Sequence, residues 1–288
     1  NFGSQADWPA HPDLLDWLAV EFAKPTRLPE VAGKPAQAWD MKAMIKFIML
    51  SHAYRQSSSA PEELYRRDPE NRLLARGPRF RLKGETVRDQ ALAISGLLVP
   101  KIGGPSTRPY MPVGVWDETN RYGNLRNYKA TTGDGLYRRS MYTIWKRTAA
   151  PPSMLLFDAP NREICTPKRA RTNTPLQALA LMNEVTYVEA ARALAQRMMI
   201  EGGDTVESRL TTGFRLVTAR TPDKETLAVL KSGFERRRKE FNEKPEAAKA
   251  LIMQGTSKPD PSLDAHELAA YSATASILLN LDRVVTKD

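Results

Sequence analysis

The residues best suited to chemistry lie in the segment 158–173, DAPNREICTPKRARTN. Arg162, Arg169, Arg171 and Asn173 stand just before an apolar pattern that is typical of a helix. The unpaired N–H groups and the dipole of a helix N-terminus favour a nearby anion, and arginine adds bidentate donors. We expect these four side chains to bind a carboxylate, sulfate or phosphate group.

A structural role is the alternative for the same segment. The arginines would then pair with Asp158, Glu163 and backbone carbonyls, because an irregular loop needs such bonds to satisfy its buried polar groups. Cys165, the single cysteine, lies beside Lys168 but has no histidine close in sequence. A nucleophilic thiol needs a base, so we interpret Cys165 as a small buried residue.

Aromatic and acidic residues nearby suggest a sugar site. Trp116 and Trp145 could act as platforms for sugar rings, and glycosidases use two carboxyl groups at a set separation. The acid and base candidates for such a reaction are Asp117, Glu118, Asp158 and Glu163. Spacing alone does not identify a pair among them.

Helices flank this segment on both sides. Thr174, Pro175 and Gln177 form the sequence of a capping box with proline in the first helical position, so a helix is expected from 174 to about 199. Apolar periodicity predicts the further helices at 11–24, 40–56, 82–98, 204–219, 222–242 and 264–285.

The part between residues 99 and 173 has no such period and is rich in glycine, proline and aromatic residues. Only 137–147, with alternating Tyr, Thr, Ile and Trp, indicates a short strand. We therefore expect a mainly α fold: a multi-helix domain with a long irregular central insertion and at most a short β element. Its parts are a helical region 1–98, the insertion 99–173 and a helical region 174–288, together one compact domain.

Bulk composition narrows the function classes. The 288 residues carry a formal net charge of +10, which attracts anions of any kind. No apolar run is long enough to span a membrane, and no C-x-x-C-H haem motif or cysteine-rich zinc pattern occurs. Nucleic-acid binding would depend on charge alone, because no helix-turn-helix, zinc-finger or Walker pattern is present.

Residues 137–197, YRRSMYTIWKR through VEAARALAQR, closely resemble the core of a planctomycete-specific C-terminal domain of unknown function. Similar blocks occur at 1–22, 49–58, 68–96, 103–116 and 275–288, so the resemblance covers nearly the whole chain. Such domains end large exported proteins, after a cytochrome-c-like domain and a second planctomycete-specific domain.

This resemblance implies an extracytoplasmic module, periplasmic or at the cell surface, that continues from upstream domains of the same polypeptide. It implies no cofactor in this chain and a c-type haem upstream, and it brings no catalytic residues with it. Our leading hypothesis is therefore a haem-linked module that binds an anionic ligand in polysaccharide turnover. The alternatives are a glycan-degrading hydrolase or lyase, and a scaffold that docks onto the upstream domain.

Overall fold

The structure is a computed structural model, and it describes residues 8–116, 128–166 and 168–287. Contacts within the chain divide it into two compact units, residues 1–79 and 80–287. Helix α4 (Gly84–Ser95), expected at the end of an N-terminal part, belongs to the second unit because it packs against α7 (Val185–Glu201). That the whole chain folds as one domain stays a prediction.

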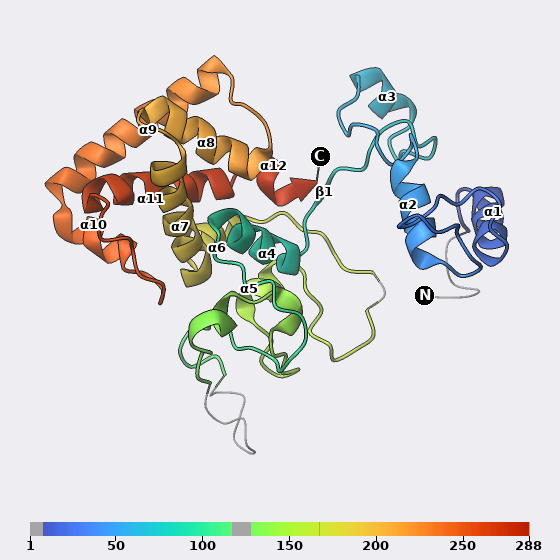
Figure 1. Cartoon of the computed structure of the whole chain (residues 1–288), viewed down its shortest axis with the longest axis horizontal. Helices are drawn as coiled ribbons and strands as arrows, with labels where there is room; N and C mark the ends of the chain where they lie inside the picture. Colours follow the sequence, from blue (N-terminus) through green and yellow to red (C-terminus); the bar gives the residue numbers. More distant parts are fainter. Residues whose placement is uncertain (1–7, 117–127, 167, 288) are drawn as a thin grey trace. The chain divides into compact units, whose positions relative to one another are not determined.

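The first unit contains helices α1 (Pro12–Ala23), α2 (Met41–Leu50) and α3 (Glu62–Arg67), joined by long loops (Figure 1). Among its described residues, Ala43 is the one apolar side chain that is buried. The buried polar side chains include Glu21, Asp68 and Arg76. Glu21 accepts hydrogen bonds from the backbone N–H groups of Thr26 and Arg27 at 2.9 Å. Polar bonds to local backbone therefore hold this unit, rather than an apolar core.

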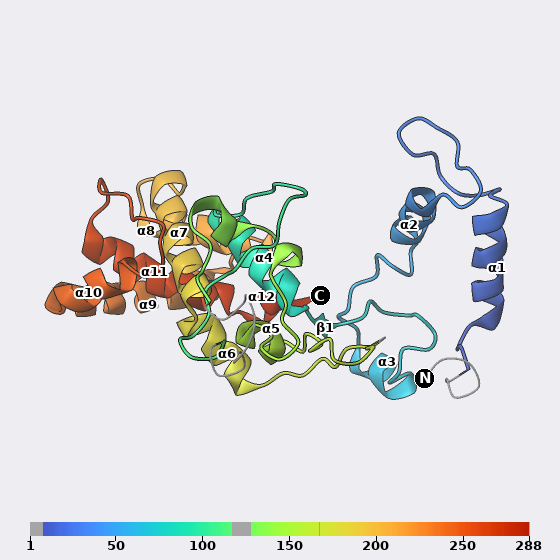
Figure 2. The same ribbon diagram turned by 90° about the horizontal axis from the view of Figure 1, so that it is seen from below.

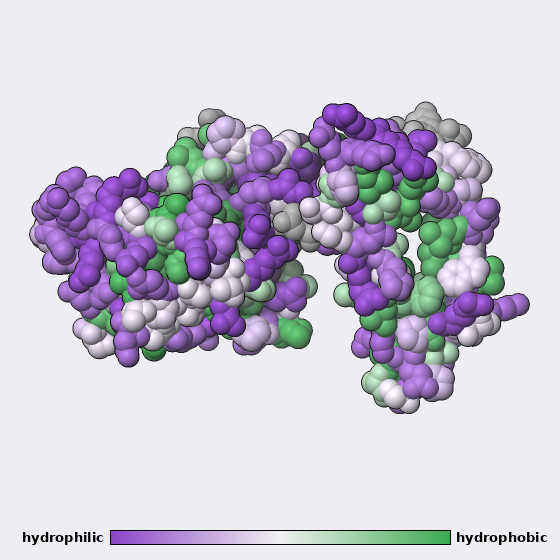
Figure 3. Space-filling view, turned by 90° about the horizontal axis from the view of Figure 1, so that it is seen from above, coloured by the Kyte–Doolittle hydropathy of each residue, from purple (hydrophilic) through white to green (hydrophobic). Residues whose placement is uncertain are grey.

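Large apolar side chains cover the surface of the first unit instead. On α1 and α2 they lie at helical spacing, yet Val20 is 62% exposed and Met41 is 66% exposed. Figure 3 shows hydrophobic residues gathered on the surface of this unit. The apolar surface of the first unit is defined here as Leu14, Leu15, Trp17, Val20, Met41, Ile45, Ile48, Met49 and Leu50.

The second unit is built around α7 and α11 (Ala265–Leu279), which cross at its centre in both ribbon views (Figures 1 and 2). Alanines at 190, 191, 193 and 195 let neighbouring helices approach α7 closely, and α11 is buried on nearly all sides. Around this pair pack α6 (Pro175–Asn183), α8 (Val206–Thr218), α9 (Lys224–Glu243), α10 (Pro245–Ile252) and α12 (Asp282–Val285).

These helices confirm the mainly α prediction. Residues 174–199, however, form two helices rather than one, because Glu184 is extended (ψ 135°) and caps α7 by accepting from the N–H of Thr186 at 3.1 Å. The strands β1 (Phe80–Arg81) and β2 (Thr286–Lys287) form one short antiparallel pair. This pair was not expected from the sequence. It joins the first residues of the second unit to residues 286–287.

The expected strand at 137–147 is wrong. This stretch contains the end of the 3-10 turn η2 (Gly133–Tyr137), the turn η3 (Ser140–Tyr142) and isolated bridges such as the one between Thr107 and Thr143. The short helix α5 (Pro152–Leu156) follows. Between residues 99 and 150 the backbone therefore has few regular partners in the described part of the chain.

Two arginines hold this irregular stretch in place. Arg88 on α4 is 4% exposed and donates to the carbonyls of Leu136 at 2.6 Å and Arg138 at 2.9 Å. Arg138 in turn donates to the carbonyls of Pro105 at 3.0 Å and Lys101 at 3.1 Å. In a sheet, the N–H groups of a neighbouring strand donate to the backbone carbonyls. In this segment guanidinium groups supply those hydrogen bonds, because buried carbonyls need donors.

We predict that Arg88→Met destabilises the protein by about 3 kcal/mol, because it leaves buried carbonyls without donors while keeping the volume of the side chain. The matched control is Arg139→Met, whose side chain is 53% exposed. The control should change the free energy of unfolding by no more than about 0.5 kcal/mol. Urea unfolding followed by circular dichroism measures both, and equal effects would contradict a special role for Arg88.

Candidate anion-binding site

The segment 158–173 forms a loop whose two ends are joined by hydrogen bonds. Asp158, in a left-handed conformation (φ 60°), accepts from the backbone N–H of Thr172 at 2.7 Å and from its hydroxyl at 3.0 Å. Gln177 is fully buried and donates to the carbonyl of Leu156 at 2.7 Å and to the Thr172 hydroxyl at 3.2 Å. Both ends of the loop are thus fixed against the start of α6.

The start of α6 also follows the predicted capping pattern. Proline occupies the first helical position, and the Gln177 side chain accepts from the backbone N–H of Thr174 at 3.4 Å. The helix therefore begins where the sequence indicates, and its buried glutamine joins the cap to the loop that carries the arginines.

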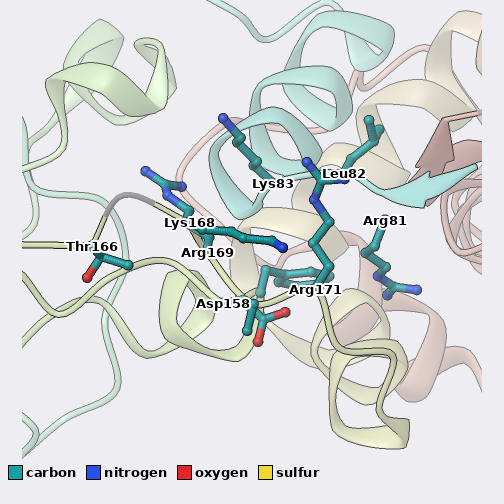
Figure 4. A pocket seen from close by; sticks show the side chains of 10 residues that line it. Arg81, Leu82, Lys83, Asp158, Thr166, Lys168, Arg169 and Arg171 are labelled. Atoms are coloured by element: carbon teal, nitrogen blue, oxygen red, sulfur yellow. The ribbon is translucent and has the colours of Figure 1, made fainter. Parts of the chain in front are cut away.

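The loop meets the segment 81–83 around a cavity of about 500 Å³, which we call the cationic cavity (Figure 4). Its size lies within the ordinary range for ligand pockets, about 300–1,000 Å³. Five cationic side chains line it together with one carboxylate: Arg81, Lys83, Lys168, Arg169, Arg171 and Asp158. Asp158 keeps its negative charge while it accepts hydrogen bonds from Thr172, so it offsets one of the cations and positive charge remains in excess around the cavity.

The cations of this cavity are positioned by different partners. Arg81 on β1 donates to the side-chain oxygen of Asn173 at 3.0 Å, and the Arg171 guanidinium lies 4.1 Å from the centre of the Phe80 ring. Lys168 and Arg171 are exposed. Stacking on an aromatic ring keeps the hydrogen-bond donors of a guanidinium free for another group.

Arg169 has an acidic partner. One of its guanidinium nitrogens donates to both carboxylate oxygens of Glu85, at 2.8 and 2.9 Å, and both side chains are less than one third exposed. Partial burial works to raise the pKa of Glu85, but the hydrogen bonds from Arg169 and from its own backbone N–H outweigh it and lower the pKa. Glu85 therefore stays ionised and partly neutralises Arg169.

A second cavity of about 630 Å³ lies next to the first, and Lys83 and Arg169 line both. We call it the indole cavity, because Trp145 is part of its wall. Arg162, also in its wall, places its guanidinium 4.6 Å from the centre of the Trp145 ring. The indole N–H of Trp145 donates to the carbonyl of Asn161 at 3.2 Å.

The structure thus places four of the six predicted ligand-binding residues in the walls of two neighbouring cavities. Arg169 and Arg171 line the cationic cavity, Arg162 and Trp145 line the indole cavity, and Asn173 supports Arg81. Their roles as ligand-binding residues stay predictions.

Trp116 occupies a different environment from the one predicted. It is 2% exposed, and its ring packs 5.0 Å from that of Tyr128 and 5.0 Å from the ammonium nitrogen of Lys146. A platform for a sugar ring needs an open face, which this buried indole does not offer.

The predicted acid and base candidates do not form a described pair. Asp117 and Glu118 lie outside the described residues. Asp158 lines the cationic cavity, whereas Glu163 is exposed and makes bonds with Asn161 of its own turn. Cys165 is exposed, so its interpretation as a buried residue is wrong.

Sequence analysis missed Arg81, Lys83 and Glu85. The sequence does contain a similar pattern there. Arg81 and Lys83 stand at the start of the helix expected at 82–98, much as Lys168, Arg169 and Arg171 stand before the helix expected from 174. These residues reach the loop 158–173 only because distant segments pack together. Arg169 and Glu85, for example, are 84 positions apart in the sequence.

Within residues 8–116, 128–166 and 168–287, no three His, Cys, Asp or Glu side chains lie close enough together to bind a metal ion. Over the same ranges, every helix is too short or too polar to cross a bilayer.

Residues 1–234 match the model of a family described as "Protein of unknown function (DUF1553)". The match includes the loop 158–173 and all the described cations of the cationic cavity. No curated protein and no solved structure matches the sequence.

We predict that Glu85→Gln lowers the free energy of unfolding by about 1 kcal/mol at pH 7, because it removes a partly buried ion pair. The folded pKa of Glu85 is depressed, so this stabilisation is present above the unfolded pKa of about 4.3 and is lost as pH falls through the folded value. The difference between wild type and variant should therefore begin to shrink as pH falls below about 4.3 and continue to shrink toward pH 3. Urea unfolding at pH 7 and pH 3 tests this, and a constant difference would contradict it.

Proposed function

The chain belongs to the DUF1553 family of unknown function, and from the cationic cavity we propose that it binds an anionic ligand there. One observation carries the proposal: five cations from two distant segments line one cavity, and Asp158 is the one carboxylate among the described residues of its lining. Like charges repel, so gathering them without an anion costs free energy that a bound anion would recover.

The geometry suits a group with several acceptor oxygens. The guanidinium of Arg171 offers a planar set of donors while it stacks on Phe80, and Lys168 adds a point charge from the same loop. Carboxylate, sulfate and phosphate groups all accept such bonds, and arginine can bind each with two parallel hydrogen bonds.

We extend the proposal to the biological setting that the sequence suggested. The chain acts as an extracytoplasmic module in a planctomycete polypeptide whose upstream part carries a c-type haem, and its ligand is an anionic polysaccharide undergoing turnover. The support for this setting is the resemblance of residues 137–197 to planctomycete-specific C-terminal domains.

We do not extend the proposal to glycan hydrolysis or elimination. Such a reaction needs two carboxyl groups that converge on the sugar. Of the described candidates, Asp158 is held by Thr172 and Glu163 lies exposed on the loop.

Docking onto an upstream domain of the same polypeptide is a second candidate function. It is favoured by the apolar surface of the first unit, where residues at helical spacing such as Met41 and Ile45 are 66% and 52% exposed. Apolar patches of this kind are typical of protein interfaces. Binding of the anion in the second unit and docking by the first are compatible with each other.

For anion binding, we predict that Lys168→Ala with Arg171→Ala weakens binding to chondroitin sulfate about tenfold or more at ~0.15 M salt, since two charge-assisted contacts are lost. The matched control is Arg238→Ala with Lys239→Ala, a pair of exposed cations on α9. Titration calorimetry at low and at physiological salt measures both. Equal losses in the two double variants would reduce the effect to bulk charge.

For docking, we predict that amide hydrogen exchange in α2 is slower in the longer polypeptide than in this chain, because a partner domain covers its apolar side chains. Helix α9 serves as the internal control and should exchange at the same rate in both. Unchanged exchange in α2 would show that the apolar surface of the first unit has no partner upstream.

A further inference from the structure

The indole cavity differs in chemistry from the cationic cavity beside it. Its wall combines the indole of Trp145 and the thioether of Met141, which is 65% exposed, with the carboxylates of Glu85 and Asp89. Four cationic side chains, Lys83, Arg139, Arg162 and Arg169, also line it. The two carboxylates offset part of this charge, and the apolar wall suits a group that has an apolar face and hydroxyl groups at its edge.

The two acidic groups of this cavity are fixed by bonds within the protein. Asp89 accepts from the backbone N–H of Ser140 at 2.7 Å and lies 3.8 Å from the guanidinium of Arg139, while Glu85 holds Arg169. Their positions are therefore set before any ligand arrives. A preorganised acceptor costs less to engage than a mobile one.

Arg169 and Lys83 line both cavities, so a ligand that fills one of them reaches the edge of the other. The Glu85 carboxylate lies on the side of the indole cavity and holds the guanidinium of Arg169 there. An anion in the cationic cavity competes with Glu85 for that guanidinium. Arg169, one of the two side chains at the boundary between the cavities, can thus bond in either direction.

From this arrangement we infer that the indole cavity is a second subsite of the same binding site, and that the ligand is an acidic oligosaccharide. An anionic substituent occupies the cationic cavity. A neighbouring sugar ring lies in the indole cavity, against the part of the Trp145 indole that the Arg162 guanidinium does not cover, with its hydroxyl groups on Glu85 and Asp89. This inference rests on the proposed function, to which it adds a second subsite and the residues that hold the sugar ring next to the anionic group.

A nucleotide fits the same pattern less well. Its phosphates suit the cationic cavity, and its base could stack on Trp145. The acidic groups of the indole cavity would then meet a base that offers few donors, whereas a sugar ring offers a hydroxyl at most of its carbons. We therefore assign the subsite to a sugar, and a nucleotide is one outcome of the test.

The test compares three probes on the full chain: inorganic sulfate, a chondroitin sulfate tetrasaccharide and ATP. Trp145→Ala should weaken binding of the tetrasaccharide about tenfold and leave binding of sulfate unchanged, because sulfate occupies the cationic cavity alone. Lys168→Ala with Arg171→Ala should weaken both. Trp39→Ala, which removes a tryptophan that is 68% exposed in the first unit, is the control and should change neither.

Trp145→Phe keeps a flat apolar face, and it should lose less affinity for the tetrasaccharide than Trp145→Ala does. It also serves as the test variant if Trp145→Ala does not fold by circular dichroism. The second subsite would be overturned if neither change at Trp145 alters the affinity for the tetrasaccharide while Lys168→Ala with Arg171→Ala still lowers it. The anion site would then remain supported.

Two further results are decisive. If ATP binds more tightly than the tetrasaccharide and depends on Trp145, the assignment to a sugar is wrong. If neither sulfate nor the tetrasaccharide responds to Lys168→Ala with Arg171→Ala, the proposed function itself fails, and the inference fails with it.

Discussion

The second unit depends on guanidinium groups that replace secondary structure. Arg88 leaves the middle of α4 and bonds to the carbonyls of Leu136 and Arg138, and Arg138 reaches on to residues 101–105. Without these donors the chain from 99 to 150 would leave buried carbonyls unsatisfied, because it has no extended strand to pair with in the described part. The same helix carries Glu85 at its first turn, so one element fixes both the scaffold and the site.

Charge balance explains why the two cavities differ although they share a wall. Cations outnumber carboxylates around the cationic cavity, and the nearest carboxylate that could neutralise Arg169 is Glu85, on the side of the indole cavity. The wider chain adds no compensation, since its formal net charge is +10. Positive charge is thus in excess around both cavities, and the two carboxylates of the indole cavity reduce that excess on its side.

How much of this the sequence could predict depends on the range of each interaction. The start of α6 was predictable because Thr174, Pro175 and Gln177 act within one turn. The break before α7 was not, because the apolar period runs on through residue 184 and the interruption depends on a buried glutamate that caps the next helix. Arg169 and Arg171, predicted as anion-binding residues, line the cationic cavity, whereas Arg81, Lys83 and Glu85 join them only through packing between distant segments.

The first unit shows the limit of a different rule. Apolar residues at helical spacing are expected to face a core, yet on α1 and α2 most of them are exposed, and the described buried residues of this unit are largely polar. Its loops are closed by carboxylates on backbone N–H groups, as Asp68 closes the turn at Arg72 and Leu73 at 2.8 Å. Such local bonds can define a shape without burying the area that stabilises a domain. The amphipathic pattern of α1 and α2 therefore describes an exposed surface, and periodicity alone cannot distinguish such a surface from a core.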